Sequence, residues 1–265
     1  MGKRIEVTDE LLKLVSEKKS AREISSILGI NYTTVHRKLR KLGINLPNYH
    51  NELKFDNSVF DCIDSEEKAY WLGFLYADGY VCGTNNGVEL SLKGEDKVHL
   101  EKFRQFLNCR IDVKMGKVTC NRKIFSRCRL YLRDKHFHDK LIELGCVPNK
   151  SLILKFPNHN IFSNNNLIIH FIRGYIDGDG CLSYTSTGRL SVQIIGTNEF
   201  LDGIMNIFPD IFHKGKKDYR HPNSNTYTIT CSCDKADKLT DTLYKNATVF
   251  LDRKYNRYKK FSRYE

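Results

Sequence analysis

The sequence of 265 residues lacks two kinds of apolar segment. It has no run approaching the roughly eighteen apolar residues that a membrane span requires. Its charged start, MGKRIEVTDE, has no apolar core of signal-peptide length. We therefore expect an intracellular, cytoplasmic protein without a membrane partner.

Paired cysteines are lacking as well. The chain has nine cysteines, an odd number, and none of them belongs to a CxxC motif. Structural zinc sites usually combine such pairs at a fixed spacing. The thiols are therefore expected to be reduced and to serve as small hydrophobic residues.

Acidic residues are scarce relative to basic ones. The sequence holds 43 Lys and Arg against 31 Asp and Glu, which gives a net charge of +12. Such an excess attracts polyanions, of which nucleic acid is the usual one. Only 5 residues are proline and 40% are hydrophobic, which indicates a globular chain of one large domain or a few small ones.

Residues 1–46 show the pattern of a small helical domain. Apolar side chains form one stripe in SAREISSILG and another in NYTTVHRKLRKLG, with Gly29 between them and Asn31 placed to cap the second helix. The pattern resembles the helix-turn-helix units of resolvases and transcription regulators, whose second helix enters the major groove. This resemblance implies DNA contacts by Tyr32, Thr33, Thr34, His36, Arg37 and Arg40.

A three-helix unit of this kind can instead bind protein. Residues 1–50 contain twice as many Lys and Arg as Asp and Glu, which favours DNA as the partner. The polar stretch at 47–64 has few apolar residues and is interpreted as a linker.

The rest of the chain is an internal repeat. In each half an apolar helical stretch precedes an alternating strand pattern and a further helix, and Asp134 corresponds to Asp234. Each half is expected to run helix, strand, strand, helix, strand, strand, helix. The predicted halves are residues 65–150 and 164–265, joined by a connector at 151–163.

The two apolar stretches, WLGFLYADG at 71–79 and IRGYIDGDG at 172–180, both end in Asp-Gly. Asp78 and Asp179 would stand at the C-terminal ends of helices, where the helix dipole disfavours a negative charge. Two such carboxylates side by side would also repel each other unless a cation lies between them. Hard divalent cations held by carboxylates are typical of phosphodiester hydrolysis.

Small residues recur four positions apart in both stretches. Because residues i and i+4 share one face of a helix, these positions would let two helix backbones approach closely. The helix interface is therefore expected at Gly73, Ala77, Gly174 and Gly178.

The two stretches resemble the paired motifs of the LAGLIDADG homing endonucleases, in the single-chain branch with two motifs. Each has a small residue third and Asp-Gly last, although the sixth letter of the first motif is Tyr76, where the second has Asp177. The resemblance extends over roughly 65–265. It implies an α+β fold in which two pseudo-symmetric αββαββα units form a DNA-binding saddle.

The same resemblance implies the site residues. The eighth letter of each motif is the metal-binding carboxylate of the family, which here would hold Mg²⁺. Lysines late in each half, in GCVPNKS and VFLDRKYNRY, match a family lysine that could stabilise the developing phosphorane charge, although any basic residue could simply contact phosphate. The implied catalytic residues are Asp78, Asp179, Lys150 and Lys254. The two aspartates and the backbone carbonyls of Gly79 and Gly180 are the implied metal ligands, and Lys93 and Gln193 are further candidates near the site.

These inferences together predict a monomeric, Mg²⁺-dependent homing endonuclease that cuts double-stranded DNA at a long site. Strands at 117–133 and 183–194 are expected to read the major groove, unless they form an ordinary solvated sheet face. One alternative is a non-catalytic transcription regulator, but such regulators look degenerate at the acidic positions retained here. The other alternative, an intron maturase that binds RNA on the same fold, stays open.

Overall fold

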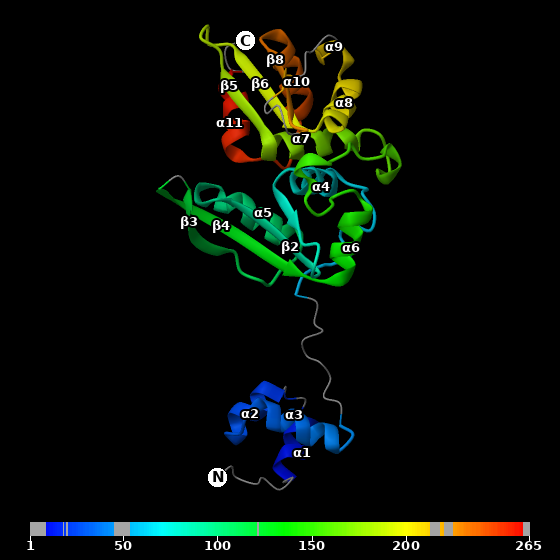
Figure 1. The fold of residues 1–265 in the computed structure, drawn as a ribbon, viewed down its shortest axis with the longest axis vertical. Coiled ribbons are helices and arrows are strands. Elements are labelled where there is room, and N and C mark those ends of the chain that lie inside the picture. The colour runs from blue at the N-terminus through cyan, green and yellow to red at the C-terminus, as the bar shows by residue number, and fades with distance from the viewer. Residues whose placement is uncertain are drawn as a thin grey trace. The chain divides into compact units, whose positions relative to one another are not determined.

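The computed structural model describes residues 9–17, 19, 21–44, 54–120, 122–212, 218–219 and 225–261. The chain divides into two compact units, Met1–Lys54 and Phe55–Glu265, and each has its own hydrophobic core (Figure 1). The boundary expected at residue 46 lies outside the described residues.

The first unit contains three helices, α1 (Asp9–Ser16), α2 (Ala21–Leu28) and α3 (Tyr32–Lys41). Gly29 has a φ of +60°, which lets the chain turn between α2 and α3. Asn31 caps α3, because its side chain accepts a hydrogen bond from the Thr33 backbone N–H at 2.9 Å. The apolar stripes of the helices form the core, which consists of Leu11, Leu14, Ala21, Ile24, Val35 and Leu39.

The second unit begins with one half built on a four-stranded antiparallel sheet. Its helices are α4 (Glu66–Asp78), α5 (Lys97–Phe106) and α6 (Lys135–Glu143). Its strands are β1 (Gly79–Val81), β2 (Gly87–Lys93), β3 (Lys114–Cys120) and β4 (Lys123–Arg133), in the order β1-β2-β4-β3. Buried residues alternate with partly or fully exposed ones along most of β2 and the later part of β4, so the helices cover one face of the sheet and the other face is open.

The other half has the same arrangement. Its helices are α7 (Leu167–Asp179), α8 (Asn198–Ile207), α9 (Pro209–Phe212), α10 (Asp234–Tyr244) and α11 (Asp252–Phe261). Its strands are β5 (Gly180–Tyr184), β6 (Leu190–Gly196), β7 (Asp218–Tyr219) and β8 (Tyr227–Ser232), in the order β5-β6-β8-β7. The expected combination of helices with antiparallel sheets is confirmed, and Figure 1 shows the halves meeting where α4 and α7 lie side by side.

Helices α4 and α7 touch through their backbones. A Cβ added at Gly73 would lie 1.9 Å from the carbonyl oxygen of Phe171, and one at Gly174 would lie 1.9 Å from that of Tyr70. Both distances are far inside van der Waals contact, so only glycine fits at these two positions. Nine consecutive residues of α4 are buried, which explains why the helix is apolar on all sides rather than amphipathic.

Residues 55–64 differ from the expected linker and belong to the core of the second unit. The large apolar residues of this stretch are few, but all are buried, namely Phe55, Val59, Phe60 and Ile63. The rings of Phe55 and Phe137 lie 5.2 Å apart in an edge-to-face contact, so α6 provides part of the surface that the segment covers. Tertiary contact, and not local pattern, makes this segment part of the domain.

The close helix contact predicts a sharp sensitivity to one added methyl group. Gly174→Ala is expected to lower the free energy of unfolding by roughly 1–3 kcal/mol or more, because its Cβ would collide with backbone. Gly116→Ala in β3 is the matched control, since the nearest atom to its Cβ would be Arg127 Cγ at 3.9 Å. Urea unfolding measures the difference, and equal stabilities would contradict the backbone contact.

Candidate metal and nucleic-acid site

Asp78 and Asp179 are the last residues of α4 and α7, and the contact between the two helices brings these ends together. A Cβ added at Gly178 would lie 2.3 Å from Ala77 Cβ and 3.2 Å from Asp78 Oδ2. The residues expected at the helix interface therefore all lie along this contact, namely Gly73, Ala77, Gly174 and Gly178.

Both carboxylates are in surroundings that disfavour their charge. Burial is the main cause that raises the pKa of Asp78 to about 6, and the negative charge of Asp179 raises it further. The side chain of Asp179 reaches solvent, yet the protein packed around it still raises its pKa, while Lys150 and Lys254 lower it. Two neighbouring carboxylates of this kind make a site that a cation would stabilise.

Lys254, in the first turn of α11, is buried against the C-terminal end of α7. Its ammonium group donates hydrogen bonds to the carbonyls of Ile176, Asp177, Gly178 and Gly180 at 2.6, 2.7, 3.2 and 2.5 Å. It thereby adds a donor at the helix end, where backbone carbonyls lack helical partners, and it places a positive charge at the negative end of the dipole. Burial is the main cause that lowers its pKa to about 8.

Lys150 begins a short 3₁₀ turn, Lys150–Leu152, and its ammonium group donates to the carbonyl oxygen of Gly79. A cavity of about 210 Å³ brings Lys150 together with Asp179 of the other half, and its lining also includes Tyr76, Ala77, Tyr175 and Thr197. Among the positive charges, that of Lys150 lowers the pKa of Asp179 most. The charge of Lys254 lowers the pKa of Asp78 most. The main countercharge of each aspartate therefore comes from the other half.

The carbonyl oxygens of Gly79 and Gly180 accept hydrogen bonds from these two lysines. Because an ammonium group repels a metal ion, this arrangement favours the two carboxylates over the two carbonyls as metal ligands. Within the described residues, no group of three or more His, Cys, Asp or Glu side chains is arranged to hold a metal.

Asp177, to which the motif pattern gives no chemical role, lies at the centre of a buried hydrogen-bond network. Its carboxylate accepts from the hydroxyls of Tyr70 and Tyr244, at 2.7 and 2.6 Å, and from the Leu251 backbone N–H at 2.8 Å. Leu251 directly precedes α11, so Asp177 fixes the start of the helix that carries Lys254. The sequence does contain a signal for this network, because Asp177 is an acidic residue inside an apolar helix. A carboxylate buried in such a helix requires hydrogen-bond donors.

Helix α11 also binds the first half through ion pairs. Lys102 Nζ lies 2.7 Å from Asp252 Oδ1, and Arg253 Nε lies 3.1 Å from Asp96 Oδ2. The helix therefore contacts both halves, and it holds Lys254 between them.

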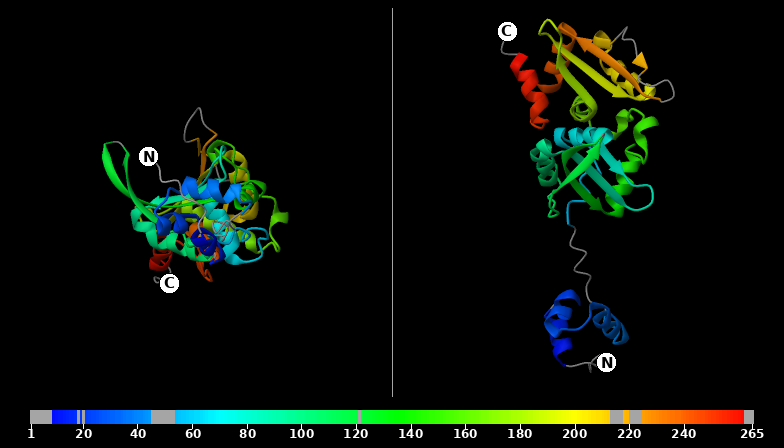
Figure 2. Two further views of the ribbon diagram at one scale, coloured as in Figure 1. Left: turned by 90° about the horizontal axis from the view of Figure 1, so that it is seen from below. Right: turned by 60° about the vertical axis from the view of Figure 1, so that its left-hand side comes forward.

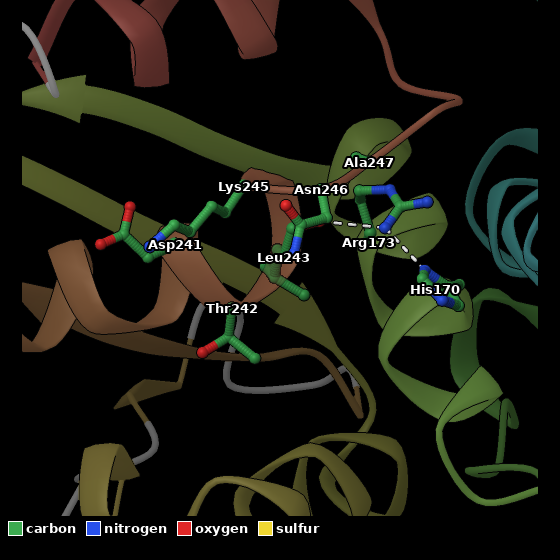
Figure 3. A pocket seen from close by; sticks show the side chains of 8 residues that line it. All are labelled: His170, Arg173, Asp241, Thr242, Leu243, Lys245, Asn246 and Ala247. Atoms are coloured by element: carbon green, nitrogen blue, oxygen red, sulfur yellow. Dashed lines mark hydrogen bonds between the residues drawn. The ribbon is translucent and has the colours of Figure 1, made fainter.

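A second cavity, of about 350 Å³, lies near the other end of α7 and is lined by none of the expected site residues (Figure 3). Arg173 borders it and is almost fully buried, with 1% exposed. Its guanidinium group donates to the carbonyls of Leu243 and Val249, each at 3.0 Å, and to Glu66 Oε1 at 2.6 Å. These internal bonds give Arg173 a structural role in joining α7 to α10, to the segment that follows α10, and to α4.

The residues of α3 expected to contact DNA lie on the surface of the first unit. Thr34 is partly exposed, and the others are exposed, namely Tyr32, Thr33, His36, Arg37 and Arg40. The Tyr32 hydroxyl and His36 Nε2 lie 2.9 Å apart on the outer side of the helix. In the second unit, Lys93 and Gln193 are exposed on β2 and β6.

Neither a family model nor a curated protein sequence matches the chain. Solved structures do match: the homing endonuclease I-WcaI, bound to its DNA recognition sequence, aligns with a TM-score of 0.52 and 12% identity over 73% of this chain and 87% of that one. The LAGLIDADG homing endonuclease I-GzeII, in complex with its DNA target, aligns with a TM-score of 0.45 and 16% identity over 74% and 88%.

Over 73% of its length, the chain has the fold of a homing endonuclease. The I-LtrWI LAGLIDADG homing endonuclease, bound to target DNA, gives a TM-score of 0.45 and 14% identity over 75% of this chain and 89% of that one. The two repeated stretches of the sequence form the C-terminal parts of α4 and α7, and Asp78 and Asp179 are the final residues of these helices.

The raised pKa of Asp78 predicts a pH-dependent change in stability. The folded pKa of about 6 exceeds the ordinary value of 3.8, so the folded state loses stability as the pH rises through this window. Asp78→Asn is therefore expected to be more stable than the unchanged protein at neutral pH in metal-free buffer. The gain should disappear below the ordinary pKa, where both states bind the proton.

Urea unfolding at acidic and neutral pH, in the presence of a chelator, measures this gain. Asp210→Asn is the control, because Asp210 is 82% exposed and lies outside the motifs. A gain of equal size at both pH values would show that the charge of Asp78 is not its cause.

Proposed function

We propose that the protein is a site-specific endonuclease of the homing type, which hydrolyses phosphodiester bonds in both strands of double-stranded DNA. The observation that carries the proposal is the pair of carboxylates, Asp78 and Asp179, set side by side by the contact of α4 and α7. The fold shared with I-WcaI, an endonuclease bound to its recognition sequence, supports it. The net charge of +12 suits a polyanionic substrate.

The donor set at the helix ends fits a Mg²⁺ ion. Mg²⁺ is typically held by one or two carboxylates, with phosphate oxygens and water completing its coordination. Asp78 and Asp179 would be the protein ligands, and their mutual repulsion would be relieved by the bound charge. When bound, a divalent cation stabilises the charge on the reacting phosphate and lowers the pKa of a coordinated water.

The two lysines are proposed to have different tasks. Lys150 lines the cavity that contains Asp179 and is only partly buried, so its ammonium group can reach an oxygen of the scissile phosphate. Lys254 is buried and donates to four carbonyls of the α7 end, so it orients the helix end that bears Asp179. Lys150 would stabilise developing charge, and Lys254 would position the carboxylate.

The two halves are proposed to act as pseudo-symmetric parts of one DNA-binding saddle in a monomer inside the cell. Their open sheet faces would lie in the major groove, which admits a two-stranded ribbon. Figure 2 shows the hairpin of β3 and β4 extending beyond the helices, and the residues of β3 that have a described side chain are all exposed. The first unit would act as a helix-turn-helix, with α3 as its recognition helix.

Loss of either carboxylate is expected to abolish cutting and to spare binding. Asp78→Asn and Asp179→Asn should each lose Mg²⁺-dependent double-strand cleavage of a library of duplex sites, because each removes a ligand of the shared cation. Both should keep their affinity for DNA, since neither removes a positive charge. Gel analysis of cut ends and parallel binding assays measure both properties, with Asp210→Asn as the control.

Other outcomes of the same experiment identify the alternatives. Sequence-specific binding without any cutting by the unchanged protein would indicate a transcription regulator. Tight binding of a structured intron RNA in preference to duplex DNA would indicate a maturase. Cleavage that persists in both variants would show that neither Asp78 nor Asp179 is required for the reaction.

Removal of residues 1–50 tests the proposed role of the first unit. The cut leaves Phe55, which belongs to the core of the second unit, in place. If α3 contacts DNA, the shortened chain should bind its selected site more weakly and with a flatter dependence of log K on log salt, because fewer counterions are released. Binding measured over a salt series checks this, and an unchanged affinity and footprint would exclude the role.

A further inference from the structure

The open faces of the two sheets carry different chemistry at matching positions. Gly79 pairs with Leu90 in the first half as Gly180 pairs with Ile194 in the second, so the two hydrogen-bond registers can be matched strand by strand. Charged residues of the first sheet then match neutral residues of the second: Glu89 with Gln193, Arg129 with Thr228, and Arg133 with Ser232.

In the first sheet, the Glu89 carboxylate lies near two arginines of the neighbouring strand. Its Oε1 is 3.8 Å from Arg127 Nη2, and its Oε2 is 3.7 Å from Arg129 Nη1. These separations exceed hydrogen-bond length, so the carboxylate orients both guanidinium groups without fixing either in place. The arginine side chains are 35% and 44% exposed, so the cluster presents two guanidinium forks and one carboxylate on the open face.

We propose that the cluster of Glu89, Arg127 and Arg129 recognises guanine–cytosine pairs in the major groove, an inference that rests on the proposed function. Guanine presents two acceptors, O6 and N7, which match an arginine fork, and cytosine presents its N4 amino group, which a carboxylate accepts. The matching position of Arg129 in the second sheet holds Thr228, which has no such fork and is buried. The two halves therefore read chemically different half-sites.

The presence of the Glu89 carboxylate favours contact with a base over contact with a phosphate. A phosphate seated on Arg127 and Arg129 would also face Glu89 at close range, and like charges repel. Backbone contacts need no acidic residue, whereas a cytosine amino group needs an acceptor. Lys93 and Lys114, which pair in register with Arg127 and Arg129, provide the point charges that suit phosphate.

The variant Arg129→Lys tests the inference, because lysine keeps the positive charge but lacks the planar fork. The full chain selects bound sequences from a library of randomised DNA duplexes in buffer with a chelator. The unchanged protein should enrich a site with guanine–cytosine pairs, and Arg129→Lys should lose the guanine preference at one pair. Its affinity for the selected site should fall roughly 5- to 100-fold with an unchanged salt slope.

Thr230→Ala, on the open face of β8, is the matched control and should retain that guanine preference. Equal urea midpoints for the variants establish that each is folded. If Arg129→Lys selects the same site with the same affinity, or if only Arg129→Ala weakens binding, Arg129 contacts phosphate and the inference fails while the proposed function stands. If the unchanged protein enriches no sequence at all, site-specific binding fails and the inference falls with it.

Discussion

The contact between the backbones of α4 and α7 is the constraint on which the rest of the second unit depends. Two helices can approach this closely only because Gly73 and Gly174 have no side chain where the other backbone passes. The approach brings Asp78 and Asp179 together at the helix ends, and β1 and β5 begin at the very next residues. One steric condition therefore sets both the position of the carboxylates and the origin of the two sheets.

This arrangement places negative charge where a helix end already disfavours it, and the protein opposes the effect with positive charge drawn from elsewhere in the chain. Lys254 supplies donors to the α7 end, Asp177 fixes the segment that carries Lys254, and two ion pairs bind α11 to the first half. Asp78 nevertheless keeps a raised pKa, because burial disfavours its charge and the negative charge of Asp179 repels it. These contacts therefore hold the two carboxylates in place without cancelling the effects that disfavour their negative charge. A cation-binding site requires carboxylates held in this way.

Local features of the sequence predicted the parts of the fold that depend on local physics. The repeated apolar stretches, the alternating strands and the side chain of Asn31 each specify their own element, because periodicity and capping involve residues close in the chain. The sequence pattern did not reveal the burial of the large apolar residues in 55–64, the partners of Asp177 or the effect of Lys254 and Lys150 on the pKa of the two aspartates. These depend on groups that only the folded chain brings together.

The difference between the two open sheet faces follows from the same distinction. Hydrogen-bond register and core packing act on the backbone and on the buried face, so they hold both halves to one strand order. Neither condition restricts an exposed side chain on the other face, so Glu89 in the first sheet can correspond to Gln193 in the second. Two sheets with the same strand order can thus present different surfaces, while Asp78 and Asp179 keep equivalent places at the ends of α4 and α7.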